Sequence, residues 1–314
     1  MTSGELFFAC LLDVMVGDPR WFPHPVRLIG RVIGQCDRRI RRVARTPGAE
    51  RVAGVALALG LPSLMYLVGW LVIEAAGLIH EAGRAAAGVL LAWTTLAARD
   101  LLDHALVVWR SLEAGKLEAA RQAVGRIVGR DTACLSEPEV VRATVETIAE
   151  STSDGVIAPL MYLTLGGPPL ALAFKAVSTL DSMIGHLDER YRQIGWASAR
   201  LDDLVNWVPA RLTGLLFVAA AGLSGGRAGQ AWRILFRDGH KHPSPNSGRP
   251  EAAMAGALGV QLGGANVYAG VPSDRPWLGD SLAPMVPRRI AEALRLMGVA
   301  SGLAVLLGTA FLAL

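Results

Sequence analysis

The chain has 314 residues, of which 52% are hydrophobic and only 18% are charged, and its formal net charge is +4. Soluble domains carry about 25% charged residues, so this composition excludes a disordered chain and disfavours an ordinary soluble enzyme. Its 35 glycines and 17 prolines are frequent for plain helices but are tolerated in interrupted membrane helices. The sequence therefore predicts an all-α, multi-pass integral membrane protein that forms a single membrane-embedded domain over residues 1–314.

The predicted membrane part comprises about four to five hydrophobic segments. Two of them, Val52–Ile73 and Leu296–Leu314, are free of charge and long enough to cross a bilayer as helices. Three shorter runs are Leu6–Gly17, Ala85–Ala98 and Leu212–Leu223. The last of these spans a bilayer only if its helix begins earlier in the chain.

A further apolar segment, Val156–Val177, is interrupted at its middle by Gly166-Gly167-Pro168-Pro169. Because proline lacks an N–H donor and glycine relaxes the backbone, this quartet predicts two half-helices instead of one. The polar stretches on both sides of the segment carry chemistry that would belong to one site. We therefore expect a broken hairpin that does not cross the membrane.

Nine arginines lie between Asp18 and Arg51. A basic run can bind nucleic acid, but beside apolar segments it is more often a cytoplasmic topology signal. We expect this loop on the cytoplasmic side, no nucleic-acid partner, and a site formed by cytoplasmic-side helices and loops.

The first polar segment joins two proline turns, Gly17-Asp18-Pro19 and Pro23-His24-Pro25. Such turns predict a rigid loop that holds Asp18, His24 and Arg27 at the membrane edge. The alternative is an interfacial loop whose Arg27 contacts lipid headgroups.

A second polar segment begins with a capping box formed by Ser136 and Glu139, which predicts a helix from about Glu137. On that helix Arg142, Glu146 and Glu150 follow one another at intervals of four and form one charged stripe. The stripe is either functional or a solvated face with salt bridges. The segment Ser151–Gly155 is expected to end the helix.

A third polar segment runs from Lys175 to Tyr191. Its polar residues have the spacing of one helical stripe: Lys175, Ser178, Thr179, Ser182, His186 and Glu189. Lysine can bind phosphate, and the neighbouring Asp181 can bind Mg²⁺. The alternative is an amphipathic helix on the membrane surface.

Asp202, Asp203 and Asn206 follow in a short Asp-Asp-x-x-Asn motif, which places oxygen ligands on one helical face. The motif predicts a Mg²⁺ site, although any amphipathic helix can carry it.

The last polar segment is the proline-rich loop from His240 to Glu251. It is expected to lead into a helix over Glu251–Leu262 that Gly263-Gly264 terminates. Backbone N–H groups at the helix start, with Ser247 and Arg249, are typical of an anion site. His240 and His242 lack a third ligand at zinc spacing, so zinc is not expected.

Six motifs of the chain occur in the order GDPRWFPHPVRLIGR, GRDTACL, AESTSDGVIAPLMY, KAVSTLDSMIGHLDERY, ARLDDLVNWVPARLT and SPNSGRPEAAMAGALGVQLGG. Together they resemble the adenosylcobinamide-phosphate synthase (CobD/CbiB) family of cobalamin biosynthesis. The resemblance covers the chain from about Leu12 to Gly270.

The resemblance implies a multi-pass enzyme of the bacterial inner membrane whose active site faces the cytoplasm. Such an enzyme joins adenosylcobyric acid to an aminopropanol phosphate, or a related amino-alcohol phosphate, through an amide bond. The reaction would use ATP and Mg²⁺ and yield adenosylcobinamide phosphate. A membrane-bound cobalamin synthase is a candidate partner in the bilayer.

This activity implies roles for particular residues. Candidate metal ligands are Asp181, Asp202, Asp203 and Asn206. Candidate substrate and phosphate ligands are Arg27, Arg130, Asp131, Arg211, Ser244, Asn246 and Glu251. Lys175 is expected to act in catalysis by holding a phosphate, and His24 or Glu150 is expected to be the general base.

Two other functions compete with this one. The chain is also similar to AmpE-like relatives of the family, for which a sensing or signalling role without turnover is proposed. A transporter with broken helices would require inverted repeats, and the sequence shows none. The density of acidic, basic and lysine groups across all six motifs favours the enzyme.

Overall fold

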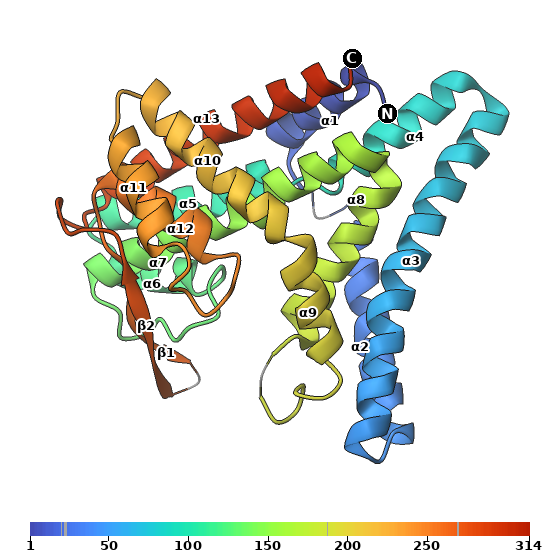
Figure 1. The fold of residues 1–314 in the computed structure, drawn as a ribbon, viewed down its shortest axis with the longest axis horizontal. Helices are drawn as coiled ribbons and strands as arrows, with labels where there is room; N and C mark the ends of the chain where they lie inside the picture. Colours follow the sequence, from blue (N-terminus) through green and yellow to red (C-terminus); the bar gives the residue numbers. More distant parts are fainter. Residues whose placement is uncertain (20, 22–23, 187, 269) are drawn as a thin grey trace. The chain divides into compact units, whose positions relative to one another are not determined.

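The computed structural model describes residues 1–19, 21, 24–186, 188–268 and 270–314, most of them in helices (Figure 1). The helices are α1 (Ser3–Val16), α2 (Pro25–Val43), α3 (Pro47–Ile79), α4 (Glu81–Trp93), α5 (Ala98–Glu113), α6 (Leu117–Val124), α7 (Glu137–Thr152), the π-helical turn η1 (Ser153–Ile157), α8 (Ala158–Ile184), α9 (Trp196–Val205), α10 (Trp207–Leu223), α11 (Ala228–Asp238), α12 (Gly248–Leu258) and α13 (Arg288–Phe311). The strands are β1 (Leu262–Tyr268) and β2 (Val271–Leu278).

Contacts within the chain divide it into two compact units. The first unit comprises residues 1–97, 158–206 and 305–314, and the second comprises residues 98–157 and 207–304. A division of contacts does not test whether the chain forms one membrane-embedded domain, so that expectation stays a prediction.

Several helices have the length and composition of membrane spans. Within the described residues, four helical stretches qualify, and a fifth arises if α9 and α10 form one bent span. The four stretches are Pro47–Ile79, Glu81–Glu113, Glu137–Ile184 and Arg288–Phe311. This finding confirms the prediction of a mostly helical, multi-pass membrane protein with four to five apolar segments.

Helix α3 shows how such a span meets its surroundings. Only 17% of its most apolar window is buried inside the structure, and side chains such as Leu67 and Leu71 are about half exposed. An apolar helix that buries so little of itself against protein is suited to contact with lipid.

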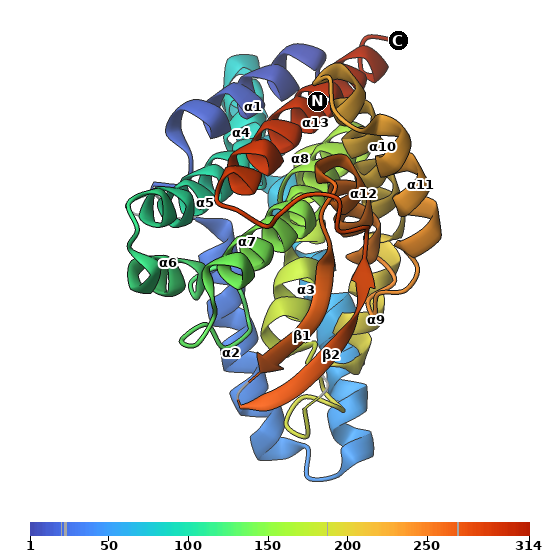
Figure 2. The same cartoon turned by 90° about the vertical axis from the view of Figure 1, so that its left-hand side faces the viewer.

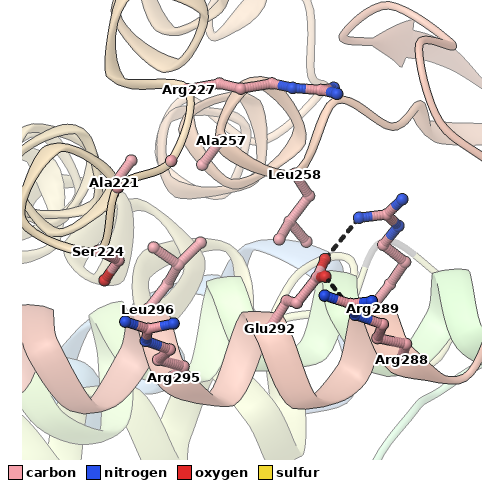
Figure 3. Close-up of a pocket in the computed structure, with 12 residues that line it drawn as sticks. Ala221, Ser224, Arg227, Ala257, Leu258, Arg288, Arg289, Glu292, Arg295 and Leu296 are labelled. Atoms are coloured by element: carbon pink, nitrogen blue, oxygen red, sulfur yellow. Dashed lines mark hydrogen bonds and ion pairs between the residues drawn. The ribbon is translucent and has the colours of Figure 1, made fainter.

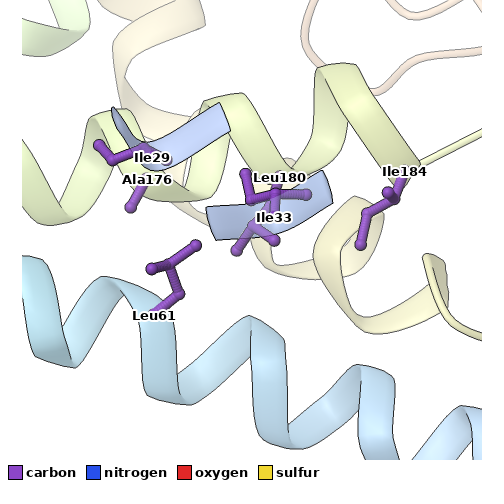
Figure 4. Packing of buried hydrophobic residues seen from close by; sticks show 6 residues of the cluster. All are labelled: Ile29, Ile33, Leu61, Ala176, Leu180 and Ile184. Carbon is purple, nitrogen blue, oxygen red and sulfur yellow. The ribbon is translucent and has the colours of Figure 1, made fainter. Parts of the chain in front are cut away.

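The core of the first unit lies where α2, α3 and α8 pack together (Figure 4). Its six buried side chains are Ile29, Ile33, Leu61, Ala176, Leu180 and Ile184. Those of α2 and α8 recur every four residues, which places them on one face of each helix. Each fully buried leucine or isoleucine contributes about 1.5–3 kcal/mol to folding, so this cluster fixes α8 against its neighbours.

The interrupted apolar segment is broken as predicted. Gly167 has φ 69° and ψ −168° inside α8, a conformation open to glycine but strained for other residues. Pro168 and Pro169 follow it, are both buried, and cannot donate to the preceding turn. The break therefore has a local cause, while the crossing or return of the segment in the membrane stays a prediction.

The polar stripe that begins at Lys175 is shorter than predicted. Helix α8 ends at Ile184, and the N–H of Gly185 donates to the carbonyl of Asp181 at 2.7 Å. His186 and Glu189 therefore lie beyond the helix and do not continue its stripe. Glycine at this position closes the helix end, which the spacing of the polar residues alone did not reveal.

Helix α7 begins as predicted and ends differently. Ser136 and Glu139 form the expected capping box, and the helix starts at Glu137. The segment expected to end it, Ser151–Gly155, instead continues through Thr152 into the π-helical turn η1. A widened turn of this kind keeps the chain helical while it re-aims the side chains that follow.

The chain beyond α12 forms a β-hairpin where the sequence predicted the end of a helix (Figure 2). Helix α12 stops at Gly259, whose φ is 68°, and β1 then pairs antiparallel with β2. Gly263 and Gly264 do not end a helix; they open β1 at an irregularity in the strand register. Both have positive φ, and a Cβ on Gly264 would lie 2.3 Å from the ring of Trp277, so only glycine fits this close approach.

Candidate functional site

The residues predicted from the sequence to be functional are divided between the two units. The first unit contains His24, Arg27, Lys175, Asp181, Asp202, Asp203 and Asn206. The second unit contains Arg130, Asp131, Glu150, Arg211, Ser244, Asn246 and Glu251. Their surroundings are described unit by unit.

In the first unit, His24 caps the start of α2. Its Nδ1 accepts a hydrogen bond from the Val26 N–H at 3.3 Å, and its Nε2 lies 3.7 Å from a carboxylate oxygen of Asp18. Arg27 lies 3.9 Å from the same carboxylate, so the three polar residues of this turn come together as predicted. Pro23, part of the predicted turn, is outside the described residues. Both nitrogens of the His24 ring face partners, which favours a structural role for the ring over that of general base.

A cavity of about 320 Å³ adjoins this turn within the first unit. Its basic rim is formed by His24, Arg27 and Arg31, while Val68 and Leu172 belong to its apolar wall. A basic rim over an apolar hollow suits a molecule that has an anionic group and an apolar body.

At the end of α9, Asp202 and Asn206 are joined directly. The Asn206 side-chain amide donates to the Asp202 carboxylate at 3.0 Å, and the other Asn206 side-chain atom, Oδ1, is buried without a hydrogen-bond partner among the described residues. Asp203 lies 3.4 Å from Arg200. Lys175 and Asp181 are both half-buried on α8. No cluster of three or more His, Cys, Asp or Glu side chains that could hold a metal occurs in the described part of the chain.

In the second unit, Glu150 meets the proline-rich loop. The Ser247 hydroxyl donates to a carboxylate oxygen of Glu150 at 2.7 Å, while Glu150 itself is exposed at the end of α7. The Ser244 hydroxyl accepts from the N–H groups of Asn246 and Ser247, at 3.3 and 3.2 Å, and so orders the loop before α12. Asn246 is buried. The structure thus brings predicted site residues Glu150, Ser244 and Asn246 into one neighbourhood.

His242 belongs to the same loop and was not predicted as a functional residue. Its Nδ1 accepts from the Ser244 N–H at 3.0 Å, and Arg275 lies 3.2 Å from its Nε2. Burial, together with the positive charge of Arg275, lowers the pKa of His242 below its ordinary value. A neutral ring is therefore favoured at neutral pH, and it helps to hold the loop. Its one sequence signal, the His-x-His pair, resembled an incomplete metal site.

Beneath the loop, α7 holds the hairpin through buried charges. Arg130 donates to Glu146 and to the side-chain oxygen of Asn266, and Glu146 accepts the N–H of Gly263 at 2.7 Å. Arg142 donates to the carbonyls of Gly263 and Ala265. The charged stripe of α7 is consequently not a solvated face: Arg142 and Glu146 are 7% and 5% exposed.

Three of the predicted ligands are already engaged within the second unit. The Arg130 guanidinium is bound in the buried network, which favours positioning over direct contact with phosphate. The Asp131 carboxylate accepts the N–H of Gly270 at 2.8 Å and so anchors the hairpin turn. Arg211 donates to the carbonyl of Trp207 at 2.7 Å and lies over its ring, 3.8 Å from the centroid.

Glu251 is the buried acid of this unit. Its side chain lies in the first turn of α12 and is 2% exposed. Burial raises its pKa well above the ordinary value of 4.5, and the negative charges of Glu146 and Glu150 raise it further, against the opposing effect of Arg275 and Arg130. Glu251 is thus favoured in its protonated form, in which it donates a hydrogen bond instead of accepting a proton.

The raised pKa of Glu251 predicts a loss of stability with rising pH. The folded state binds more protons than the unfolded state once the pH exceeds about 4.5, so the free energy of unfolding falls as the pH rises from there through the folded-state pKa. Glu251→Gln removes this term, and the variant is expected to lose less stability than the wild type between pH 5 and pH 9. The measurement is the thermal unfolding midpoint in detergent across that range. The exposed Glu113, replaced by Gln, is the control, and parallel pH curves for wild type and Glu251→Gln would contradict the assignment.

Comparison with known proteins identifies relatives along nearly the whole chain. The family model for the CobD/Cbib protein matches residues 6–297. The cobalamin biosynthesis protein CobD of Geobacter metallireducens is 53% identical over 299 residues, which cover 95% of this chain and 93% of that protein. CobD of Klebsiella pneumoniae is 46% identical over 299 residues, covering 95% and 94%, and the cobalamin biosynthesis protein CbiB of Salmonella typhimurium is 46% identical over 307 residues, covering 98% and 96%. No solved structure matches the chain. Family match and relatives agree: the chain belongs to the CobD/CbiB family, with a role in cobalamin biosynthesis.

Proposed function

We propose that the protein is an adenosylcobinamide-phosphate synthase, a ligase that forms an amide bond. It would join the carboxylate of adenosylcobyric acid to the amine of an aminopropanol phosphate, or a related amino-alcohol phosphate, at the expense of ATP. The family and its relatives support the pathway. The observation that carries the chemistry is the exposed carboxylate of Glu150, fixed by Ser247 beside the buried acid Glu251.

The reaction needs two proton and charge movements that side chains can assist. A carboxylate does not condense with an amine because hydroxide is a poor leaving group, so transfer of a phosphoryl group from ATP first makes an acyl phosphate. The amine then attacks the acyl carbon, phosphate leaves, and a base takes the proton from the ammonium. Of the two predicted bases we favour Glu150, because one carboxylate oxygen is held by Ser247 while the residue stays exposed to an incoming amine.

The other predicted residues keep their proposed roles within each unit. In the second unit, Ser244 and Asn246 would bind substrate at the loop before α12, with Arg211 toward phosphate. In the first unit, Arg27 and Lys175 would hold phosphates, since the substrates and ATP bring several of them.

The residues around α9 fit a magnesium ion in part. Magnesium prefers oxygen ligands and uses one or two carboxylates beside substrate phosphates and water. Asp202 and Asn206 supply such oxygens, and the buried Asn206 Oδ1 has no hydrogen-bond partner in the described part of the chain. We propose that these two residues hold Mg²⁺, with Asp203 and Asp181 as further candidates. A bound ion would neutralise charge on the ATP phosphates.

Replacing Asn206 by Ala is expected to raise the Mg²⁺ concentration for half-maximal turnover by roughly tenfold, because one of few protein oxygens is lost. Binding of Mn²⁺, followed by electron paramagnetic resonance, should weaken in parallel without ATP present. Asp188→Asn, which changes an exposed carboxylate of the same unit, should alter neither value. Unchanged Mn²⁺ binding in Asn206→Ala would move the metal elsewhere.

The proposed location is the inner membrane, with the active site facing the cytoplasm, where ATP is available. Support comes from the apolar helices and from the arginine-rich segment between Asp18 and Arg51. A membrane-bound cobalamin synthase would be a partner in the bilayer, and nucleic acid is not a proposed partner.

The test of the function is turnover by the detergent-purified protein. Adenosylcobyric acid, aminopropanol phosphate and MgATP are supplied, and the corrinoid is followed by mass spectrometry. The expected result is a mass increase that matches amide formation and disappears without ATP. Corrinoid binding without product, from a folded sample, would favour the AmpE-like sensor instead.

A further inference from the structure

A second cavity, of about 390 Å³, lies within the second unit and contains none of the residues proposed for the reaction. It is bounded by the end of α10, the loop that follows it, the end of α12 and the start of α13. Figure 3 shows arginine side chains reaching this space from two different elements. Arg227 lies before α11, while Arg288, Arg289 and Arg295 belong to α13.

The lining is strongly basic. Four guanidinium groups face a single carboxylate, Glu292, so the formal charge of the lining is 4 − 1 = +3. Arg288 and Arg289 both bind Glu292, at 3.0 and 2.5 Å, which shows that their guanidinium groups converge on an anion. Among the described residues, the side chains of Arg227 and Arg295 have no ion pair or hydrogen bond. Two of the four cations therefore lack a protein counter-ion, and such a charge imbalance in a hollow favours an anionic ligand.

The backbone beside Arg227 is shaped for that side chain. A Cβ on Gly259 would lie 1.6 Å from the Arg227 Nη1 atom, so the absence of a side chain there leaves room for the guanidinium. The Ser224 hydroxyl, which lines the same cavity, is buried without a hydrogen-bond partner among the described residues. The cavity thus holds both fixed cations and an unused hydroxyl.

The cavity lies at the polar ends of two apolar helices. Helix α10 ends at Leu223, just before the lining loop, and α13 begins at Arg288 before its long apolar run. Both helices qualify as membrane spans, α10 as part of the bent pair with α9. Basic pockets where membrane helices reach the bilayer surface are at the depth of phospholipid headgroups.

We propose that this cavity binds a phosphate group, through Arg227 and Arg295, with Arg288 and Arg289 shared between the ligand and Glu292. The phosphodiester of an anionic lipid headgroup and a free phosphate have this chemistry in common. Glu292 competes with the ligand for the guanidinium donors, so its charge opposes binding.

The experiment measures binding by the full-length, detergent-purified protein, without substrates. Native mass spectrometry records retention of phosphatidylglycerol against phosphatidylcholine, and calorimetry records binding of inorganic phosphate and pyrophosphate. The variant is Arg227→Gln with Arg295→Gln; the charge-matched control is Arg110→Gln with Arg126→Gln, two exposed arginines of the same unit.

The double variant is expected to bind the phosphate ligand roughly thirtyfold more weakly, since each arginine near a membrane surface contributes about a fivefold preference. Glu292→Gln should bind more tightly than the wild type, and this gain cannot come from misfolding. Preference for phosphatidylglycerol without binding of the free anions would assign a lipid headgroup, and binding of phosphate or pyrophosphate would assign a soluble ligand. Equal binding by wild type and double variant, or no binding of any probe, would overturn the proposal. Because no step is a turnover measurement, this result is independent of the proposed function.

Discussion

Glu150→Gln is expected to reduce turnover by about 10²–10⁴-fold while leaving corrinoid binding intact. The change keeps the shape of the side chain and can keep the hydrogen bond from Ser247, which joins the two side chains at 2.7 Å. It removes the group that accepts the ammonium proton, and a positioned general base contributes about that factor to a rate. The measurement is single-turnover formation of adenosylcobinamide phosphate.

The pH profile separates this role from a structural one. In the wild type, turnover should fall on the acid side as Glu150 is protonated, and in Glu150→Gln that limb should disappear from the residual rate. Glu137→Gln, a change of an exposed acid on the same helix, should leave rate and profile unchanged. A wild-type rate in Glu150→Gln would return attention to His24, although both nitrogens of its ring face protein groups.

Local signals in the sequence were enough to predict most of the helices. The capping box of Ser136 and Glu139 depends on residues three apart, and it placed the start of α7 correctly. The glycine-proline quartet likewise acts on its own turn, and it placed the break in α8. Features of this kind are decided within one helical turn, so sequence patterns report them directly.

Contacts between distant segments escaped the sequence patterns. Nothing local distinguishes Gly263 and Gly264 as the start of a strand from the same pair as a helix stop. Their role depends on the approach of Trp277 and on hydrogen bonds from α7, more than a hundred residues earlier in the chain. The spacing of Arg142, Glu146 and Glu150 gave the right stripe but could not say that two of its members are buried.

Of the predicted site, the part that depends on local loop chemistry is found together. Ser244 orders its own loop through neighbouring N–H groups, and Ser247 then meets Glu150. Arg130 was predicted to hold phosphate, but in the structure it is bound to Glu146. A guanidinium that suits phosphate also suits a carboxylate, and only the fold determines which of the two it meets.

The pair formed by Arg130 and Glu146 leads to the largest expected effect on stability. Glu146→Ala leaves the buried Arg130 without its carboxylate and the Gly263 N–H without its acceptor. Breaking a buried pair in this way typically costs about 3–5 kcal/mol, because an uncompensated charge remains in the interior. The thermal unfolding midpoint in detergent should fall, and backbone amides of β1 and β2 should exchange hydrogen faster, since α7 holds the hairpin through these groups.

Removing both charges distinguishes the penalty of the unpaired group from the worth of the pair. Arg130→Met combined with Glu146→Leu takes away the stranded guanidinium, so this double variant should recover much of the stability lost in Glu146→Ala. Its hairpin amides should still exchange faster than in the wild type, because the Gly263 N–H has no acceptor in either variant. Glu118→Ala breaks an exposed pair with Arg121 and should cost no more than about 1 kcal/mol. If Glu146→Ala were as mild as that control, the buried network would not be what holds the hairpin on α7.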